Sequence, residues 1–317
     1  MPFAIIFSVI LTAIIYIALQ VAFITAVPES LLGKGWASLN FAESAGPLAG
    51  ISLVLGATWL AILLRVDAVI SPADTGLIYS GVTPRLAYAN SRNGNCPEWL
   101  ENLNSRGIPW LAVILSGVVG CIFFLPFPGW QEFIGFVTAA FAVSFAPGSV
   151  VVGALRRQLP DQERPFRLPG GDLVPVLGLI GSSLLVFWNE WAINEKMLVA
   201  FLVGYVVYAV FHATTKRTLP PLDIRNGLWF PVWILGLMVV SYFGDLDPTA
   251  PSEQAWLFPA GGDGPIGLGL GAVILVVWSV VIYYVAIASR LSPEKAAAYI
   301  QRLPADEIPA EQVAARS

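Results

Sequence analysis

Charged residues are scarce in this sequence, and histidine and cysteine are scarcer still. Only 12% of the 317 residues are Asp, Glu, Lys or Arg, whereas a soluble domain carries about 25%. The net charge of −4 provides no basic surface for nucleic acid. The two cysteines, Cys96 and Cys121, show neither metal-binding spacing nor a disulfide framework. We therefore expect neither a nucleic-acid-binding protein nor a disulfide-stabilised secreted domain.

Sequence signatures of catalysis are also absent. The chain has no G-x-x-x-x-G-K-[ST] loop, no G-x-S-x-G elbow and no H-E-x-x-H zinc site. Its one histidine, His212, is expected at a membrane edge. Asp67 and Asp74 are about 10 Å apart along a helix, so a catalytic aspartate dyad would need a kink or a carboxylate from another helix. Although that alternative stays open, the sequence predicts a protein that is not an enzyme, with no metal and no cofactor.

Apolar residues are abundant instead, at 56% of the chain, with a mean hydropathy of +0.73. Eight apolar segments approach the ~20 residues that cross a bilayer, the fifth and seventh being short. They cover residues 3–27, 57–82, 109–127, 131–154, 173–189, 195–214, 228–243 and 265–289. This pattern predicts an all-α polytopic membrane protein, with a membrane domain over 1–290 and a tail over 291–317. The last two segments carry no internal charge, and we expect them to be peripheral.

Basic residues gather in alternate loops between these segments. The loops on one side, together with the tail, contain Arg85, Arg92, Arg106, Arg156, Arg157, Arg164, Arg167, Lys216, Arg217, Arg225, Arg290, Lys295, Arg302 and Arg316. The opposite loops contain only Lys34 and Lys196. The positive-inside rule then places both termini in the cytoplasm, which requires an even number of spans. We expect a multi-pass protein of the cell membrane.

One apolar segment carries a polar face. Asp67, Ser71, Asp74 and Thr75 follow one another at i, i+4, i+7 and i+8, which places them on one side of a helix. Ionisable groups at membrane depth usually face a bundle interior or a water-filled path. A proline here, Pro72, displaces a backbone carbonyl that can help to bind a cation or an ammonium group. The pattern predicts one wall of a substrate or ion site. In the alternative interpretation, Asp67 is solvated in a vestibule or paired with a basic residue.

The fourth segment offers a further candidate, Ser144. Pro147, three residues later, loosens the carbonyl of Val143 next to this serine. Two interpretations stay open. Either Ser144 lines the site, or the segment is a kinked packing helix, rich in small residues, whose serines bond to their own backbone.

Two loops on the predicted cytoplasmic side resemble those of the amino acid–polyamine–organocation permeases. The first contains Arg85, Tyr88, Arg92, Gly94 and Pro97 before the turn Gly107-Ile108-Pro109, and the second reads PDQERPFRLPGG over 160–171. Within the first loop, we expect residues 85–92 to form a short interfacial helix that ends at the turn pair Asn93-Gly94. The resemblance implies a fold of two inverted five-helix repeats. The first segment corresponds to the seventh family helix, so the chain is expected to lack the first repeat and the sixth helix.

The resemblance also implies a function, namely secondary active transport of amino acids or related amines by alternating access. In sodium-coupled relatives the eighth helix supplies hydroxyl ligands to a cation, which here are Ser71 and Thr75. Asp67 or Asp74 is the expected proton-linked group, so the coupling ion is H⁺ or Na⁺. Expected partners are the lipid bilayer, the amino acid or amine substrate and a separate chain supplying the first six helices. The alternative is a non-transporting membrane remnant or accessory subunit that acts through partner helices.

Overall fold

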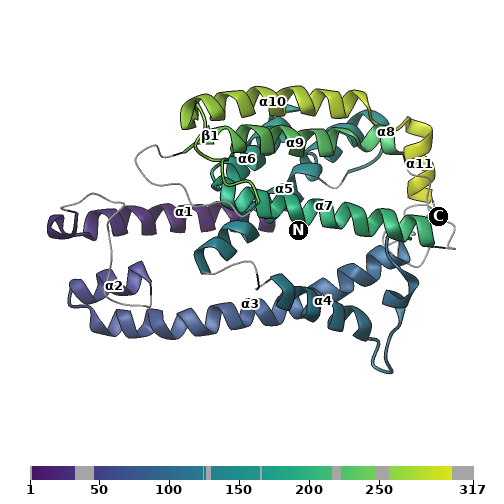
Figure 1. The fold of residues 1–317 in the computed structure, drawn as a ribbon. Helices are drawn as coiled ribbons and strands as arrows, with labels where there is room; N and C mark the ends of the chain where they lie inside the picture. The colour runs from purple at the N-terminus through teal and green to yellow at the C-terminus, as the bar shows by residue number, and fades with distance from the viewer. Residues whose placement is uncertain are drawn as a thin grey trace. The chain divides into compact units, whose positions relative to one another are not determined.

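The computed structural model describes residues 2–32, 46–123, 125, 130–164, 166–215, 223–246 and 257–301, and nearly all of its regular structure is helical (Figure 1). The α-helices are α1 (Pro2–Ala26), α2 (Pro47–Val54), α3 (Thr58–Arg92), α4 (Trp110–Phe123), α5 (Trp130–Gln158), α6 (Leu173–Phe187), α7 (Trp191–Thr214), α8 (Ile224–Gly227), α9 (Trp229–Tyr242), α10 (Leu268–Ala288) and α11 (Pro293–Gln301). The short elements are the 3-10 turns η1 (Glu29–Leu31) and η3 (Glu98–Glu101) and two parallel-paired strands, β1 (Gly244–Asp245) and β2 (Ile266–Gly267). Of the expected tail, residues 302–317 lie outside the described residues.

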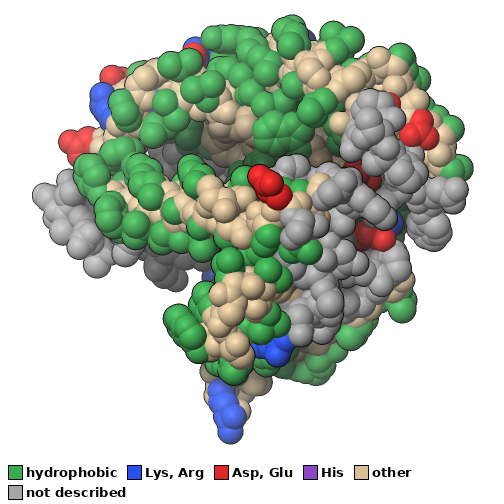
Figure 2. Space-filling view, turned by 90° about the vertical axis from the view of Figure 1, so that its left-hand side faces the viewer, with side chains coloured by type: hydrophobic (Ala, Val, Ile, Leu, Met, Phe, Trp, Pro, Cys, Tyr) green, Lys and Arg blue, Asp and Glu red, His purple; other side chains and the backbone are tan. Residues whose placement is uncertain are grey.

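Each of the eight expected apolar segments contains one helix, and several of these helices are long and apolar enough to cross a bilayer. Within the described residues, five stretches meet both conditions: Pro2–Ala26, Glu132–Gln158, Trp191–Thr214, Ile224–Tyr242 and Leu268–Ala288. Helices α4 and α6 are apolar but shorter. Hydrophobic side chains are also the most frequent type of side chain on the described surface seen in Figure 2. These features are those of a polytopic membrane protein, and the count of eight spans stays a prediction.

The chain divides into two compact units, and the first comprises Met1–Arg92 and Glu98–Gly117. Here α2 packs against α3 and buries Ala49 and Ile51, whereas α1 has no buried residue. Helix α3 runs for 35 residues through two internal prolines. The prediction of a separate short helix over 85–92 is therefore wrong. Pro84 is fully buried, and we infer that its packing offsets the one hydrogen bond that its ring nitrogen cannot donate. The helix does end at Arg92, before Asn93 and Gly94.

The second unit comprises Asn93–Pro97 and Val118–Ser317, and its core lies among α5, α6, α7, α9 and α10. Helix α5 presents a stripe of buried small residues, Ala139, Ala142 and Ala146, spaced three and four positions apart. This stripe suits close packing, and α5 and α6 approach each other closely. At Gly178 of α6, an added Cβ would lie 2.6 Å from the Ser149 hydroxyl oxygen.

Helices α9 and α10 contribute much of this core, so the prediction that they are peripheral is wrong. They lie side by side (Figure 1) and bury Trp233, Leu237, Leu275 and Tyr283 almost completely. Apolar residues are compatible with lipid and with protein alike, so the absence of charge does not indicate which of the two a helix faces. A buried hydroxyl contact joins α10 to α6, since Ser279 donates to Ser183 Oγ at 2.7 Å.

Candidate functional site

The predicted site residues of the first unit lie on α3, and all four are exposed. Asp67, Ser71, Asp74 and Thr75 occupy two turns of an unbroken helix, about 12 Å from the first to the last. The Thr75 hydroxyl donates to the Ser71 carbonyl oxygen at 3.0 Å. The local structure therefore keeps the four side chains on one side of α3, as their spacing predicts.

This face of α3 brings together the side-chain oxygen atoms of four residues within two turns. Its two carboxylates and two hydroxyls are the ligand types that suit a hard cation or a substrate ammonium group. Pro72 lies between Asp67 and Asp74 and cannot donate to the carbonyl of Ala68, which adds a possible acceptor on the same helix. The assignment of these four residues to a site stays a prediction.

Ser144 lies on α5 in the second unit, where its side chain is exposed. Its hydroxyl donates to the Phe141 carbonyl oxygen at 2.8 Å, the local bond that the packing interpretation expects of a serine within a helix. Pro147 is accommodated inside the same helix. The structure describes the two units separately, so a role for Ser144 beside α3 stays a prediction.

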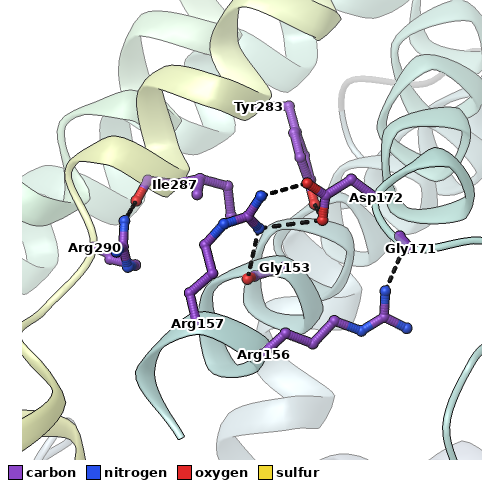
Figure 3. A network of polar contacts seen from close by, with 8 residues as sticks. All are labelled: Gly153, Arg156, Arg157, Gly171, Asp172, Tyr283, Ile287 and Arg290. Atoms are coloured by element: carbon purple, nitrogen blue, oxygen red, sulfur yellow. Dashed lines mark hydrogen bonds and ion pairs between the residues drawn. The ribbon is translucent and has the colours of Figure 1, made fainter. Parts of the chain in front are cut away.

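A polar network that the sequence did not suggest lies at one end of α5 (Figure 3). The Arg157 guanidinium contacts both carboxylate oxygens of Asp172, at 3.1 and 2.5 Å, and the Gly153 carbonyl oxygen at 3.1 Å. Tyr283 of α10 donates to Asp172 Oδ1 at 3.2 Å. Residues of α5 and α10 thus meet at one carboxylate, which lies directly before α6.

The same network fixes the loop before α6. Arg156 donates to the carbonyl oxygens of Leu168 and Gly171, and Arg164 donates to those of Leu155 and Leu159. This loop contains the PDQERPFRLPGG sequence, of which Pro165 lies outside the described residues. Arg156 of α5 therefore binds carbonyl oxygens of the loop, and Arg164 of the loop binds carbonyl oxygens at the end of α5.

Asp172 is held in its charged form by these contacts. The hydrogen bond from Arg157 lowers the pKa of this carboxyl group, and partial burial opposes the shift. The sequence signal for it was weak: one aspartate after a Gly-Gly pair at a helix start, fifteen residues after Arg157. Nothing in the pattern of α10 distinguished Tyr283.

A second unpredicted polar cluster lies at the first turn of α7. Glu195 is 1% exposed, and its carboxylate accepts the backbone N–H groups of Leu257 and Phe258 at 3.0–3.1 Å. Trp191 donates from its indole nitrogen to the Phe258 carbonyl oxygen at 3.0 Å. These bonds attach the segment before α10 to α7. Both clusters hold helices and loops together, and neither resembles a ligand site.

Several known proteins have sequences similar to that of this chain. The family model described as amino acid permease matches residues 1–239. The glutamate/serine transporter AimA of Bacillus subtilis (strain 168) is 32% identical over 294 residues, covering 92% of this chain and 52% of that protein. The aspartate-proton symporter of the same organism is 32% identical over 246 residues, covering 77% and 47%.

The similarity extends to other amino acid carriers. The branched-chain amino acid permease BcaP of Bacillus subtilis (strain 168) is 26% identical over 215 residues, covering 67% of this chain and 43% of that protein. The chain therefore spans about half the length of the curated relatives that it matches. No solved structure matches it.

Proposed function

Since the chain belongs to the amino acid permease family, we propose that it forms part of a secondary amino acid transporter, with the polar face of α3 as one wall of the substrate and ion path. The observation that carries this proposal is the exposed row of Asp67, Ser71, Asp74 and Thr75 on one side of α3. Charged side chains at membrane depth usually mark such paths. In this proposal the chain is the carboxy-terminal half, both of its termini are cytoplasmic, and the opposite wall comes from the first six family helices.

The names of the relatives suggest the substrate. One is a glutamate/serine transporter and another an aspartate-proton symporter. We propose a small or acidic amino acid as the substrate and H⁺ as the coupling ion, with Na⁺ as the alternative. Ser71 and Thr75 offer hydroxyls to the substrate or ion, and Asp67 or Asp74 carries the proton.

Electrostatics explains why a proton would accompany an acidic substrate past α3. An ionised side-chain carboxylate of the substrate is repelled by ionised Asp67 and Asp74, because like charges in a medium of low dielectric disfavour one another. Protonation of one aspartate removes part of this repulsion. The substrate and the proton then bind together more favourably than either does alone, which is the thermodynamic basis of symport.

The test is uptake of labelled aspartate, glutamate and serine into proteoliposomes that contain this chain together with the first six helices of a permease relative. We expect saturable uptake that increases when the outside is more acidic. Asp74→Asn should abolish this pH dependence, whereas Asp263→Asn, at an exposed loop position, should leave it intact. If Asp67→Asn and Asp74→Asn both keep the wild-type pH profile, proton coupling through α3 is disproved.

A second candidate, a non-transporting accessory subunit, is favoured by one observation. Helix α1 is long and apolar and has no buried residue within the described part of the chain, as expected of a helix that packs against partner helices. In that case the two-part proteoliposomes show no uptake, yet the chain still co-purifies with its partner. Uptake above background excludes this candidate.

A further inference from the structure

An apolar groove runs between α9 and α10 in the second unit. It has a volume of about 690 Å³, and hydrophobic residues of the two helices line it. Val232, Leu235 and Val239 form one rim, and Val273, Val277 and Val281 form the other. These six side chains are between 44% and 61% exposed, so the groove lies open along its length, about 12 Å.

The floor of the groove is closed by the Trp278 indole ring. This ring lies where a side chain at Gly236 would be, since a Cβ added there would overlap it. The indole N–H points toward the Trp233 carbonyl oxygen at 3.4 Å, so the ring presents carbon atoms to the groove. The groove is therefore suited to a hydrocarbon chain.

One end of the groove is basic. The Asn226 side chain donates to the Ser289 carbonyl oxygen at 2.5 Å, which brings the start of α9 and the end of α10 together (Figure 1). Arg225 and Arg290 adjoin these two residues in sequence, and both are exposed.

Acidic side chains also lie at this end of the groove. Asp223 is paired with Lys295 at 3.1 Å, which offsets its charge, and Glu294 of α11 is exposed. The described basic residues at this end, Arg225, Arg290 and Lys295, outnumber these two acidic residues, so the net charge of the described residues there is positive. An anionic group that contacts the two arginines is therefore favoured.

We propose that the groove binds an acyl chain of an anionic phospholipid, whose phosphate contacts Arg225 and Arg290. Basic residues at the cytoplasmic ends of membrane helices bind anionic headgroups, and the groove supplies the complementary apolar surface. A protein helix fits less well, because membrane helix contacts favour small residues and the rims carry Val and Leu. The inference rests on the chain lying in a membrane and not on transport.

The test is native mass spectrometry of the full 317-residue chain, released from vesicles of phosphatidylglycerol or phosphatidylcholine with identical acyl chains. We expect a single phosphatidylglycerol to stay bound, in preference to phosphatidylcholine. Replacing both arginines, Arg225→Gln with Arg290→Gln, should reduce this preference by about tenfold. The matched control, Arg106→Gln with Arg167→Gln, removes two exposed arginines elsewhere on the predicted cytoplasmic side and should not reduce it.

A second pair of variants tests the groove itself. Val277→Trp fills it and should reduce retention of both lipids, whereas Val206→Trp, at an exposed position of α7, should not. Equal retention of the two lipids by the wild-type chain overturns the proposal, and so does an equal loss in the matched controls. A dimer that Val277→Trp dissociates overturns it too, and identifies a second copy of the chain as the occupant. The arginine variants are at exposed positions, so the test does not depend on Val277→Trp folding.

Discussion

At the scale of single residues, Gly153 sets how closely α10 approaches α5. A Cβ at this position would overlap the Tyr283 hydroxyl and would lie 2.8 Å from Ile287 Cδ1. The same glycine offers its carbonyl oxygen to Arg157. The absence of one methyl group therefore permits the contact between Tyr283 and Asp172.

We expect Gly153→Ala to destabilise the chain by about 1–3 kcal/mol, because the added methyl group displaces the side chains of Tyr283 and Ile287, which are buried. The matched control is Gly148→Ala on the same helix, where an added Cβ has no neighbour within 4 Å and helix propensity favours alanine. Thermal unfolding in detergent measures both. Equal midpoints for the two variants would show that Tyr283 moves aside without cost.

Asp172 gives a pH-dependent prediction. Because its pKa is lowered in the folded state by Arg157, its contribution to stability is present at neutral pH and is lost as the pH falls below about 4. Asp172→Asn should cost about 1 kcal/mol at pH 7, since the ion pair is partly exposed, and less at pH 3. Unfolding midpoints across this range test it, with Asp161→Asn, an exposed loop aspartate, as the control. A difference that does not change with pH contradicts the prediction.

At the scale of elements, α7 holds the segment before α10 through one buried carboxylate. Glu195 accepts two backbone N–H groups, and hydrogen bonds to a charged acceptor are stronger than those to a neutral one. The neighbouring Lys196 forms an ion pair with Glu132 of α5. The first two turns of α7 thus join three parts of the second unit.

Glu195→Gln should weaken this attachment. The amide keeps one acceptor oxygen but removes the charge, so the Leu257 and Phe258 amide protons should exchange with solvent about tenfold faster or more. Hydrogen–deuterium exchange with peptide resolution measures the change. Glu190→Gln, one turn earlier and exposed, serves as the control. Unchanged protection of residues 257–258 would mean that Trp191 alone holds the segment.

At the scale of the whole molecule, the folded second unit extends beyond the region that defines the family. The family model ends at residue 239, yet α10 supplies Leu275, Ile282 and Tyr283 to the same core as α5 and α6. Ser183, Ser279 and Trp233 join α6, α10 and α9 through buried hydrogen bonds. We infer that the later helices fold together with the family helices.

A truncation tests this inference. A chain ending at residue 222 lacks α9 and α10, so Ser183 of α6 loses its buried hydrogen bonds with Trp233 and Ser279, and we expect a clearly lower unfolding midpoint than that of the full chain. A chain ending at residue 301 keeps every described helix and should match the full chain. If both truncations unfold like the full chain, α9 and α10 do not stabilise the second unit.

The sequence predicted the helices well and the contacts poorly. Apolar run length located eight helices, since the cost of an unpaired backbone polar group in lipid leaves few alternatives to a helix. The spacing of Asp67, Ser71, Asp74 and Thr75 predicted the polar face of α3, because the position of a residue around a helix depends only on its place in the sequence. The prediction of a separate helix over 85–92 was wrong. A proline usually interrupts a helix, but α3 continues through Pro84, which is buried.

The sequence by itself determined the membrane class, the helical segments and the residues that share a face of α3, which follow from local composition and spacing. It also determined the family resemblance, which rests on two loop motifs. Only the tertiary structure decided that α9 and α10 belong to the core, that Tyr283 meets Asp172 and that Glu195 holds residues 257–258. Those facts depend on which apolar faces pack together and on partners many residues apart. Because most residues of this sequence are compatible with lipid, hydropathy does not indicate which helix faces pack against protein and which face lipid.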